Sequence, residues 1–379
     1  MSHSARVAVV GLGAIGAMAM WSMAKRGVAV TGYDQFAPAN NRGASSGETR
    51  MFRVAYKEGS EYTPLLLESI DLWRELQDTS GRTLFQQHGS ITIGHPEHET
   101  LQRLRINAAE GGIDLETIDK GDMASRFPAY RLLEGEIGLF DPLGALLRPE
   151  AAVISAVEQA VGLGAMVRSG TRVVSVEEVT GGVAVVTDAG SEIYDKVIVS
   201  PGPWAMKLLP DLAPLVQPER IVSIWFPTNN PEIFRPDRFL PTVRRGNDLD
   251  MSAFPTVDGT LVKVNLHLPR TLVEDVDTRD REVEEAYAEA TRTAVRMGFN
   301  GLSDLAVRRE SYVEGYTPDM HPIVGPISSG KRIIALTGFS GHGFKFSPAM
   351  GEAAADLVIH GSTERPIDHM APHRVMVSN

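Results

Sequence analysis

The chain has 379 residues, 43% of them hydrophobic and 22% charged, which is the composition of an ordinary globular protein with two domains. Its net charge of −11 argues against a nucleic-acid partner, and the lack of any run of about 18 apolar residues argues against a membrane-spanning helix. Because the chain contains no cysteine, disulfides, thiolate metal ligands and cysteine nucleophiles are excluded.

The first elements along the chain form a dinucleotide-binding pattern. Residues 6–10, RVAVV, predict a buried strand, and the glycines of GLGAIG follow it directly. A helix is predicted over 17–25, ending at Gly27, and a second strand, 28–34, closes on an acid. The glycines allow close approach of a pyrophosphate to the helix N-terminus, and the acid can accept hydrogen bonds from a ribose. The residues assigned to the cofactor here are Gly11, Gly13, Ala14, Ile15, Gly16, Asp34 and Gln35.

Two further expectations concern this N-terminal stretch. The alternative to a cofactor site is a glycine-rich turn that binds no ligand. Because the first strand begins without a cleavable signal peptide ahead of it, we expect a cytoplasmic protein.

The middle of the chain alternates helical and strand patterns. Apolar spacing predicts helices over 61–77, 148–165 and 281–298, a strand over 88–94, short strands within 171–204, and a new sheet beginning at 219–227. His95 and His98 stand three residues apart, but no third ligand accompanies them, so we expect no metal site.

Residues 338–346, GFSGHGFKF, combine three glycines with a histidine and a lysine. Glycines this dense suit either a tight strand-to-helix turn or a backbone that passes close to a ligand, and both can hold together. A helix is expected after them, in SPAMGEAAADLVIHG, and its N-terminal amides would favour negative charge.

Six motifs carry a family resemblance, and they occur in the family's order along nearly the whole chain. They are VVGLGAIG, GETRMFRVAY (47–56), KVIVSPGPW (196–204), LVKVNLH (261–267), YTPDMHPIVG (316–325) and GFSGHGFKF. Together they resemble the amine-oxidising flavoproteins related to D-amino acid oxidase, and among these the monomeric sarcosine oxidase and N-methyltryptophan oxidase family. The resemblance favours FAD over NAD, a choice that glycine spacing alone leaves open.

The resemblance implies a fold of two parts. One is a discontinuous α/β FAD-binding domain of Rossmann type, formed by residues 1–84, 148–215 and 322–379. The other is an α+β substrate domain with a large antiparallel or mixed sheet, formed by residues 85–147 and 216–321.

The resemblance also implies which residues surround the flavin. The stretch 338–346 would bring backbone N–H groups to the pyrimidine edge of the ring, where a reduced flavin accumulates negative charge. The further cofactor-binding residues are Ser45, Ser46, Thr49, Arg50, Val173, Pro201, Gly202, Trp204, Gly338, Gly341, His342, Gly343 and Lys345.

The catalytic residues follow from the same motifs. Arg53 and Lys345 would clamp a substrate carboxylate; the residue types alone would favour surface ion pairs, and it is their position in the family's motifs that favours the clamp. Lys263 would lie over the flavin and promote reaction with O₂ by stabilising superoxide charge. His267 falls on the same strand face, where it lines the pocket or serves as a structural histidine. The full set is Arg50, Arg53, Lys263, His267, Glu314 and Lys345.

Three departures from the family pattern bear on cofactor and substrate. The family tethers flavin through a cysteine ahead of the TPD motif, whereas Tyr312 stands there in this chain, so FAD should be held non-covalently. Glu314 occupies the place of a substrate-lining tyrosine, although a shift in alignment would give that place to Tyr312 or Tyr316. Ser45 and Ser46 replace histidines.

The expected reaction is oxidation of a secondary, N-methyl or N-alkyl, amino acid. A hydride would pass from the carbon beside nitrogen to flavin N5, and reoxidation by O₂ would give H₂O₂. The alternatives are a flavin-dependent amino acid dehydrogenase, an oxidase of D-amino acids, glycine or Amadori compounds, an NAD(P)-linked reductase, and a non-catalytic flavin-binding module. The expected partners are a small amino acid or amine and O₂; the oligomeric state cannot be read from this sequence.

Overall fold

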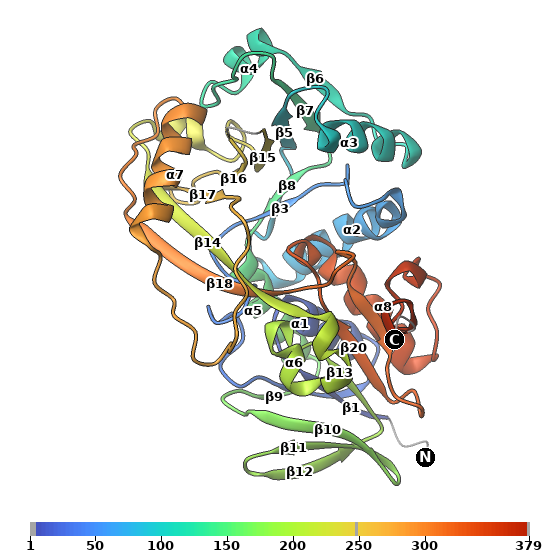
Figure 1. Ribbon diagram of the computed structural model, residues 1–379. Coiled ribbons are helices and arrows are strands. Elements are labelled where there is room, and N and C mark those ends of the chain that lie inside the picture. Colours follow the sequence, from blue (N-terminus) through green and yellow to red (C-terminus); the bar gives the residue numbers. More distant parts are fainter. Residues whose placement is uncertain (1–4, 247–248, 377–379) are drawn as a thin grey trace.

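The computed structural model describes residues 5–246 and 249–376; residues 1–4, on which the expectation about a signal peptide partly rests, lie outside the described residues. The first sheet runs in the order β19 (Ile323–Pro326), β20 (Ile333–Thr337), β13 (Lys196–Val199), β1 (Arg6–Val10), β2 (Ala29–Tyr33) and β9 (Met166–Arg168). Its strands pair in parallel except for β19. Segments from both ends and the middle of the chain therefore build one sheet, as Figure 1 shows.

Alternating side chains of this sheet enter two different cores. In β1, Val7 and Val9 pack with α1 (Ala14–Lys25), α2 (Thr63–Ser80), α5 (Pro149–Gly162) and α8 (Ser347–Ile359). Ala8 and Val10 point the other way, toward β10 (Val173–Val179), β11 (Gly182–Thr187), β12 (Gly190–Tyr194) and α6 (Ala205–Leu208). Burial on both faces explains why β1 reads as a continuous apolar run.

The second sheet is larger and mixed. It runs in the order β18 (Arg308–Tyr316), β14 (Gln217–Pro227), β17 (Leu261–Leu266), β16 (Met251–Phe254), β15 (Thr242–Arg245), β5 (Ser90–Gly94), β7 (Ile137–Asp141) and β6 (Glu116–Ile118). One face packs against α7 (Glu285–Gly298): Val262 and Val264 of β17 lie in that core. Lys263 and Asn265 alternate with them and face the opposite side, which is the side of the cavity described below.

Smaller elements join the two large sheets. A short sheet pairs β3 (Arg50–Phe52) with β8 (Ala145–Leu147) and β4 (Phe85–Gln86). It links strands on both sides of the boundary expected near residue 84, so the domain limits stay a prediction. The remaining helices are α3 (Glu99–Glu110), α4 (Lys120–Arg126) and α9 (His373–Met376), with 3₁₀ turns η1 (Ser60–Tyr62), η2 (Gly202–Trp204), η3 (Pro210–Leu215), η4 (Pro231–Phe234), η5 (Gly343–Phe346) and η6 (Asp368–Met370).

The α/β part of Rossmann type and the mixed-sheet part agree with the fold class expected from the sequence. The helix expected over 281–298 begins only at Glu285, because Arg220 of β14 holds the preceding residues: it donates to the Glu282 carbonyl and, at 2.6 Å, to Glu284. In the described residues, no helix combines the length and apolar character needed to cross a membrane.

Candidate active site

A cavity of about 1350 Å³ lies between the two large sheets and receives residues from both. Ligand pockets commonly measure roughly 300–1,000 Å³, so this one has room for a dinucleotide together with a small substrate. Most of the residues expected at the cofactor line it: Gly11, Gly13, Ala14, Ile15, Asp34, Gln35, Ser45, Arg50, Val173, Pro201, Gly202, Trp204, Gly338, Gly341, His342, Gly343 and Lys345.

At one end of the cavity, the glycine loop is held by a carboxylate. Asp34 directly follows β2 and accepts from the backbone N–H of Leu12 at 3.0 Å and of Phe36 at 2.9 Å. Burial raises the pKa of Asp34, and these two N–H groups oppose the shift. Gly11 has a φ of 92°, and a Cβ there would stand 2.2 Å from the Ser200 carbonyl oxygen, so no other residue fits without a shift of the backbone.

The start of α1 presents its amides to the same space. Ala14 begins the helix, and its N–H donates to Ser45 Oγ at 3.0 Å. Glycines without room for a side chain, a helix N-terminus and a carboxylate at the end of β2 are the elements that hold a dinucleotide, and the residues present therefore fit FAD.

Three of the residues expected at the cofactor do not line the cavity. Gly16 lies behind the loop, where a Cβ would stand 1.8 Å from the Gly11 carbonyl oxygen, so it allows the helix to pack there. Ser46 and Thr49 are buried, and the hydroxyl of each lacks a hydrogen-bond partner among the described residues. Their assignment to the cofactor stays a prediction.

The glycine-rich stretch 338–346 is the turn that joins β20 to α8 through η5. Gly338 and Gly341 have φ values of 67° and 80°, and both line the cavity. His342 reaches back to the Met320 carbonyl with Nε2 at 2.7 Å, and Trp73 Nε1 donates to the Lys345 carbonyl at 2.8 Å. A tight turn and a backbone facing the cavity are thus present together.

Two basic side chains lie near one aromatic ring in the part of the cavity next to this turn. Arg53 and Lys345, both only 7% exposed, lie 5.9 and 4.8 Å from the ring centre of Tyr56. Lys345 donates to the His342 carbonyl at 2.7 Å. By contrast, Nε and Nη1 of Arg53 are buried without a hydrogen-bond partner in the part of the chain that the structure describes. Buried guanidinium donors left unpaired are costly, so this geometry calls for an anion.

Glu58 is a site residue that the sequence analysis missed. It lines the cavity, and its Oε2 is buried without a hydrogen-bond partner among the described residues. Although burial favours the protonated form, the nearby charges of Arg53, His342, Lys57 and Lys345 lower the pKa of Glu58 to about 2. It follows Arg53 by five residues in RVAYKE, and an acid so close in the sequence to an arginine expected at the substrate carboxylate was the available signal.

Burial and nearby charges also shift the pKa of Lys345. Burial, followed by the charge of Arg53, lowers the pKa of Lys345 to about 7, although Glu58 and Glu314 oppose the shift. Burial likewise lowers the pKa of His342 to about 4, so this ring is neutral at pH 7. Lys345 therefore changes charge near neutrality.

Lys263 points from β17 into the cavity. Its side chain is 2% exposed, and Nζ donates to the carbonyl oxygens of Gly47 and Thr49 at 2.9 and 2.6 Å. Nζ also lies 4.1 Å from the ring centre of Phe254. Burial, reinforced by the charge of Arg50, lowers the pKa of Lys263 well below its usual value. Arg50 itself lines the cavity and donates to the Thr49 carbonyl at 2.8 Å.

Three alternate residues of β18, Tyr312, Glu314 and Tyr316, all line the cavity. The period of a strand puts them on one face, so a shift of two residues in alignment leaves the same surface facing the substrate. Burial raises the pKa of Glu314, while the N–H of Gly341 and the charges of Arg50 and Lys345 oppose the rise. Glu314 stays a predicted substrate-lining residue.

His267 lines the cavity on the same side as Lys263, but both its ring nitrogens are engaged. Nδ1 lies 2.5 Å from Asp250 Oδ1, and Nε2 lies 2.9 Å from Ser252 Oγ. Burial lowers the pKa of His267, whereas Asp250 raises it. Asp250 also pairs with Arg245. These partners were not predicted from the sequence, and they favour a positioning role for the ring.

His95 and His98 serve the start of α3. Nδ1 of His98 accepts from the Thr100 N–H at 3.1 Å and caps the helix, while Nδ1 of His95 accepts from Glu97 at 3.3 Å. Local capping explains why a pair of histidines occurs there.

The chain that forms this cavity matches a known protein family. The model of the FAD-dependent oxidoreductase family (DAO) matches residues 6–357. The chain is 30% identical to monomeric sarcosine oxidase of Streptomyces avermitilis, over 99% of both chains, and 30% identical to N-methyl-L-tryptophan oxidase of Yersinia pestis, over 92% of this chain and 93% of that one. In fold it is similar to NikD, an amino acid oxidase of nikkomycin biosynthesis, with a TM-score of 0.84 at 21% identity over 97% of this chain and 96% of that one.

The part of the chain that matches the family model includes the residues that would hold the cofactor. The family model spans the glycine loop, Asp34 and the turn 338–346, which the fold brings to one cavity. The protein is thus an FAD-dependent oxidoreductase, a member of the family that contains monomeric sarcosine oxidase and N-methyl-L-tryptophan oxidase.

Proposed function

We propose that the protein is an oxidase of a secondary, N-methyl or N-alkyl, amino acid. Its substrate would lose a hydride from the carbon beside nitrogen and a proton from nitrogen, leaving an imine that water hydrolyses to a carbonyl compound and an amine. When bound, FAD supplies the hydride acceptor at N5 and passes both electrons to O₂, which yields H₂O₂.

The observation that carries this proposal is the pair of unpartnered donors on Arg53. Nε and Nη1 are buried and have no hydrogen-bond partner among the described residues, while Lys345 lines the same cavity. A carboxylate offers two oxygens to such a fork, and hydrogen bonds between ions are the stronger kind. An amino acid brings this carboxylate and holds its amine a short, fixed distance away.

The N-alkyl part of the proposed substrate is supported by the names of two relatives. The two curated relatives compared above are named for oxidation of sarcosine and of N-methyl-L-tryptophan, both N-methyl amino acids. Lys263 supports an oxidase over a dehydrogenase, because a buried ammonium next to the cofactor cavity would stabilise the charge that O₂ acquires.

Arg53→Ala tests the clamp. We expect the variant to keep its bound FAD but to bind a carboxylate ligand roughly 10- to 100-fold more weakly, which corresponds to the loss of about 1.5–3 kcal/mol for hydrogen bonds to a charged group. Titration of the flavin absorbance with an amino acid analogue measures the dissociation constant. Arg238→Ala, at an exposed arginine, is the matched control and should bind like the parent. Equal affinity in Arg53→Ala would remove the clamp and leave amines without a carboxylate as the better substrates.

A further inference from the structure

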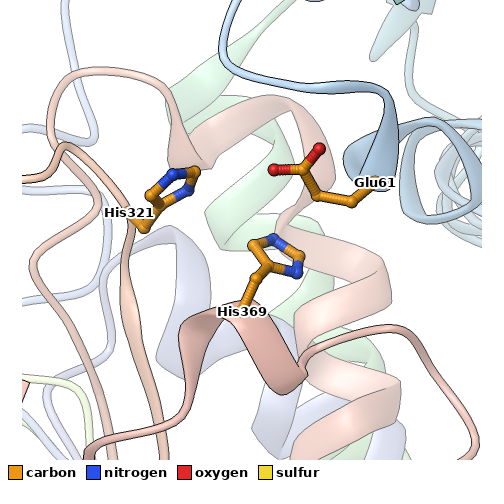
Figure 2. A group of neighbouring side chains, drawn as sticks. All are labelled: Glu61, His321 and His369. Atoms are coloured by element: carbon orange, nitrogen blue, oxygen red, sulfur yellow. The ribbon is translucent and has the colours of Figure 1, made fainter. Parts of the chain in front are cut away.

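Outside the cavity, three metal-ligating side chains converge. Glu61, His321 and His369 each offer one ligand atom, and these atoms lie within 4.8 Å of one another. The residues come from η1, from the loop between β18 and β19, and from η6, three segments far apart in the chain. Figure 2 shows the carboxylate and the two imidazole rings turned toward a shared space.

The carboxylate of Glu61 lies close to the backbone of Gly59. Gly59 has a φ of 150°, and a Cβ at that position would stand 2.0 Å from Glu61 Oε2. Only glycine therefore leaves room for the side chain of Glu61 to fold back as it does.

Aromatic contacts hold the two rings. His321 lies almost parallel to Tyr62, with an interplanar angle of 7°, and its Nδ1 is 2.7 Å from the phenol oxygen. The ring of His369 stands edge-on to Tyr62 at 4.7 Å. Nε2 of His369 is buried and has no hydrogen-bond partner within the described part of the chain. An unpaired buried nitrogen next to a second imidazole and a carboxylate needs an explanation, because buried polar atoms normally have partners.

We propose that Glu61, His321 and His369 bind one divalent transition-metal ion, and that this donor set suits Zn²⁺. Two imidazoles and one carboxylate are a common ligand set for zinc, with water completing the tetrahedron. Zinc–ligand bonds of about 2.0–2.2 Å place ligand atoms roughly 3.3 Å apart, so the side chains must close by at most about 1.5 Å. The long side chain of Glu61 can supply this movement by rotation.

The ion would stabilise segments that pack next to the active site. His321 ends the loop that begins at Thr317, whose hydroxyl donates to the His321 carbonyl at 2.8 Å and whose N–H donates to Ser340 Oγ at 3.1 Å. Tyr62 also packs edge-on against Tyr56, the ring near which Arg53 and Lys345 both lie, with the ring centres 5.0 Å apart. The metal would thus fix η1, the 317–321 loop and η6 to one another, and would contribute to stability and not to the chemistry.

The test uses the holoenzyme after treatment with EDTA and removal of the chelator. Calorimetric titration with ZnCl₂ at pH 7 should give one ion per chain, with a dissociation constant below about 10 µM. At 100 times that constant, free Zn²⁺ should raise the melting temperature by about 3 °C. Both effects should vanish in His369→Gln and in Glu61→Gln, the latter leaving the aromatic packing intact.

His360→Gln is the matched control, because His360 is exposed at the end of α8 and lies outside the cluster. It should bind Zn²⁺ as the parent does. Absence of binding by the parent, or one-to-one binding that persists in both ligand variants, would overturn the proposal.

Discussion

The ammonium group of Lys263 donates a 2.6 Å hydrogen bond to the carbonyl oxygen of Thr49. This contact ties β17 of the large sheet to the segment that enters β3 and carries Arg50 and Arg53. One buried lysine thereby links β17 to the segment that carries Arg53, and it lies at the cavity wall.

Replacement of Lys263 by methionine should separate the two half-reactions. Methionine nearly keeps the length of the side chain but deletes the charge, so stabilisation of O₂ as it accepts an electron should be lost. We expect reoxidation by air to slow at least about a hundredfold, equivalent to roughly 3 kcal/mol, while anaerobic reduction by substrate stays within about tenfold of the parent. Stopped-flow absorbance at the flavin band follows both steps.

An unchanged rate of reoxidation by air in Lys263→Met would contradict this role. It would remove Lys263 from oxygen chemistry and favour the dehydrogenase alternative. Lys331→Met, at an exposed lysine, serves as the control for the substitution itself.

Carboxylate binding should weaken as the pH rises through 7. The pKa of Lys345 is lowered to about 7 in the free protein, mainly by burial and then by Arg53. Below that pH the ammonium is charged and attracts the ligand, and above it the proton is lost, so the dissociation constant should increase by up to tenfold per pH unit. A carboxylic acid without an amino group is the ligand to use, because only protein groups then titrate.

Two titratable neighbours of Lys345, Glu58 and His342, do not produce the same profile between pH 6 and 8. Glu58, with a pKa of about 2, is ionised throughout, and His342, with a pKa of about 4, is neutral throughout. In Lys345→Met the pH dependence should flatten. A slope that survives in this variant would assign the titration to a different group.

FAD should be released when the protein is denatured. The chain has no cysteine, and Tyr312, which stands where the family has its thioether cysteine, donates instead to Glu310. After precipitation with acid, the flavin absorbance should remain in the supernatant and run as free FAD on chromatography. Flavin retained by the washed precipitate would point to a histidyl or tyrosyl link.

The sequence predicted the parts of the fold and site that local patterns encode. The apolar run at 6–10, the glycines after it and Asp34 specify a βαβ unit by themselves, and the structure holds Asp34 against the loop at Leu12. The placement of 196–204 and 338–346 beside that unit came from resemblance, since strand pairing over such separations leaves no local signal.

What the sequence missed depends on contacts between distant segments. Glu58 becomes a site residue only because Arg53 and Lys345 flank it in space, and Asp250 matters because β16 and β17 bring it to His267. Glu61, His321 and His369 are separated by hundreds of residues or by a whole helix, so no spacing rule for metal ligands detects them. The late start of α7 has the same origin in a contact from β14.

The most direct test of the proposed function is anaerobic reduction of the purified holoenzyme by a panel of amines. The panel comprises sarcosine, N-methyltryptophan, proline, glycine, D-alanine, a fructosyl amino acid and an N-methyl amine without a carboxylate. We predict that an N-alkyl amino acid bleaches the flavin absorbance fastest, and that admission of air restores it with one H₂O₂ formed per flavin reduced. Fastest bleaching by the amine without a carboxylate, or restoration only by an artificial electron acceptor, would contradict the assignment of an N-alkyl amino acid oxidase.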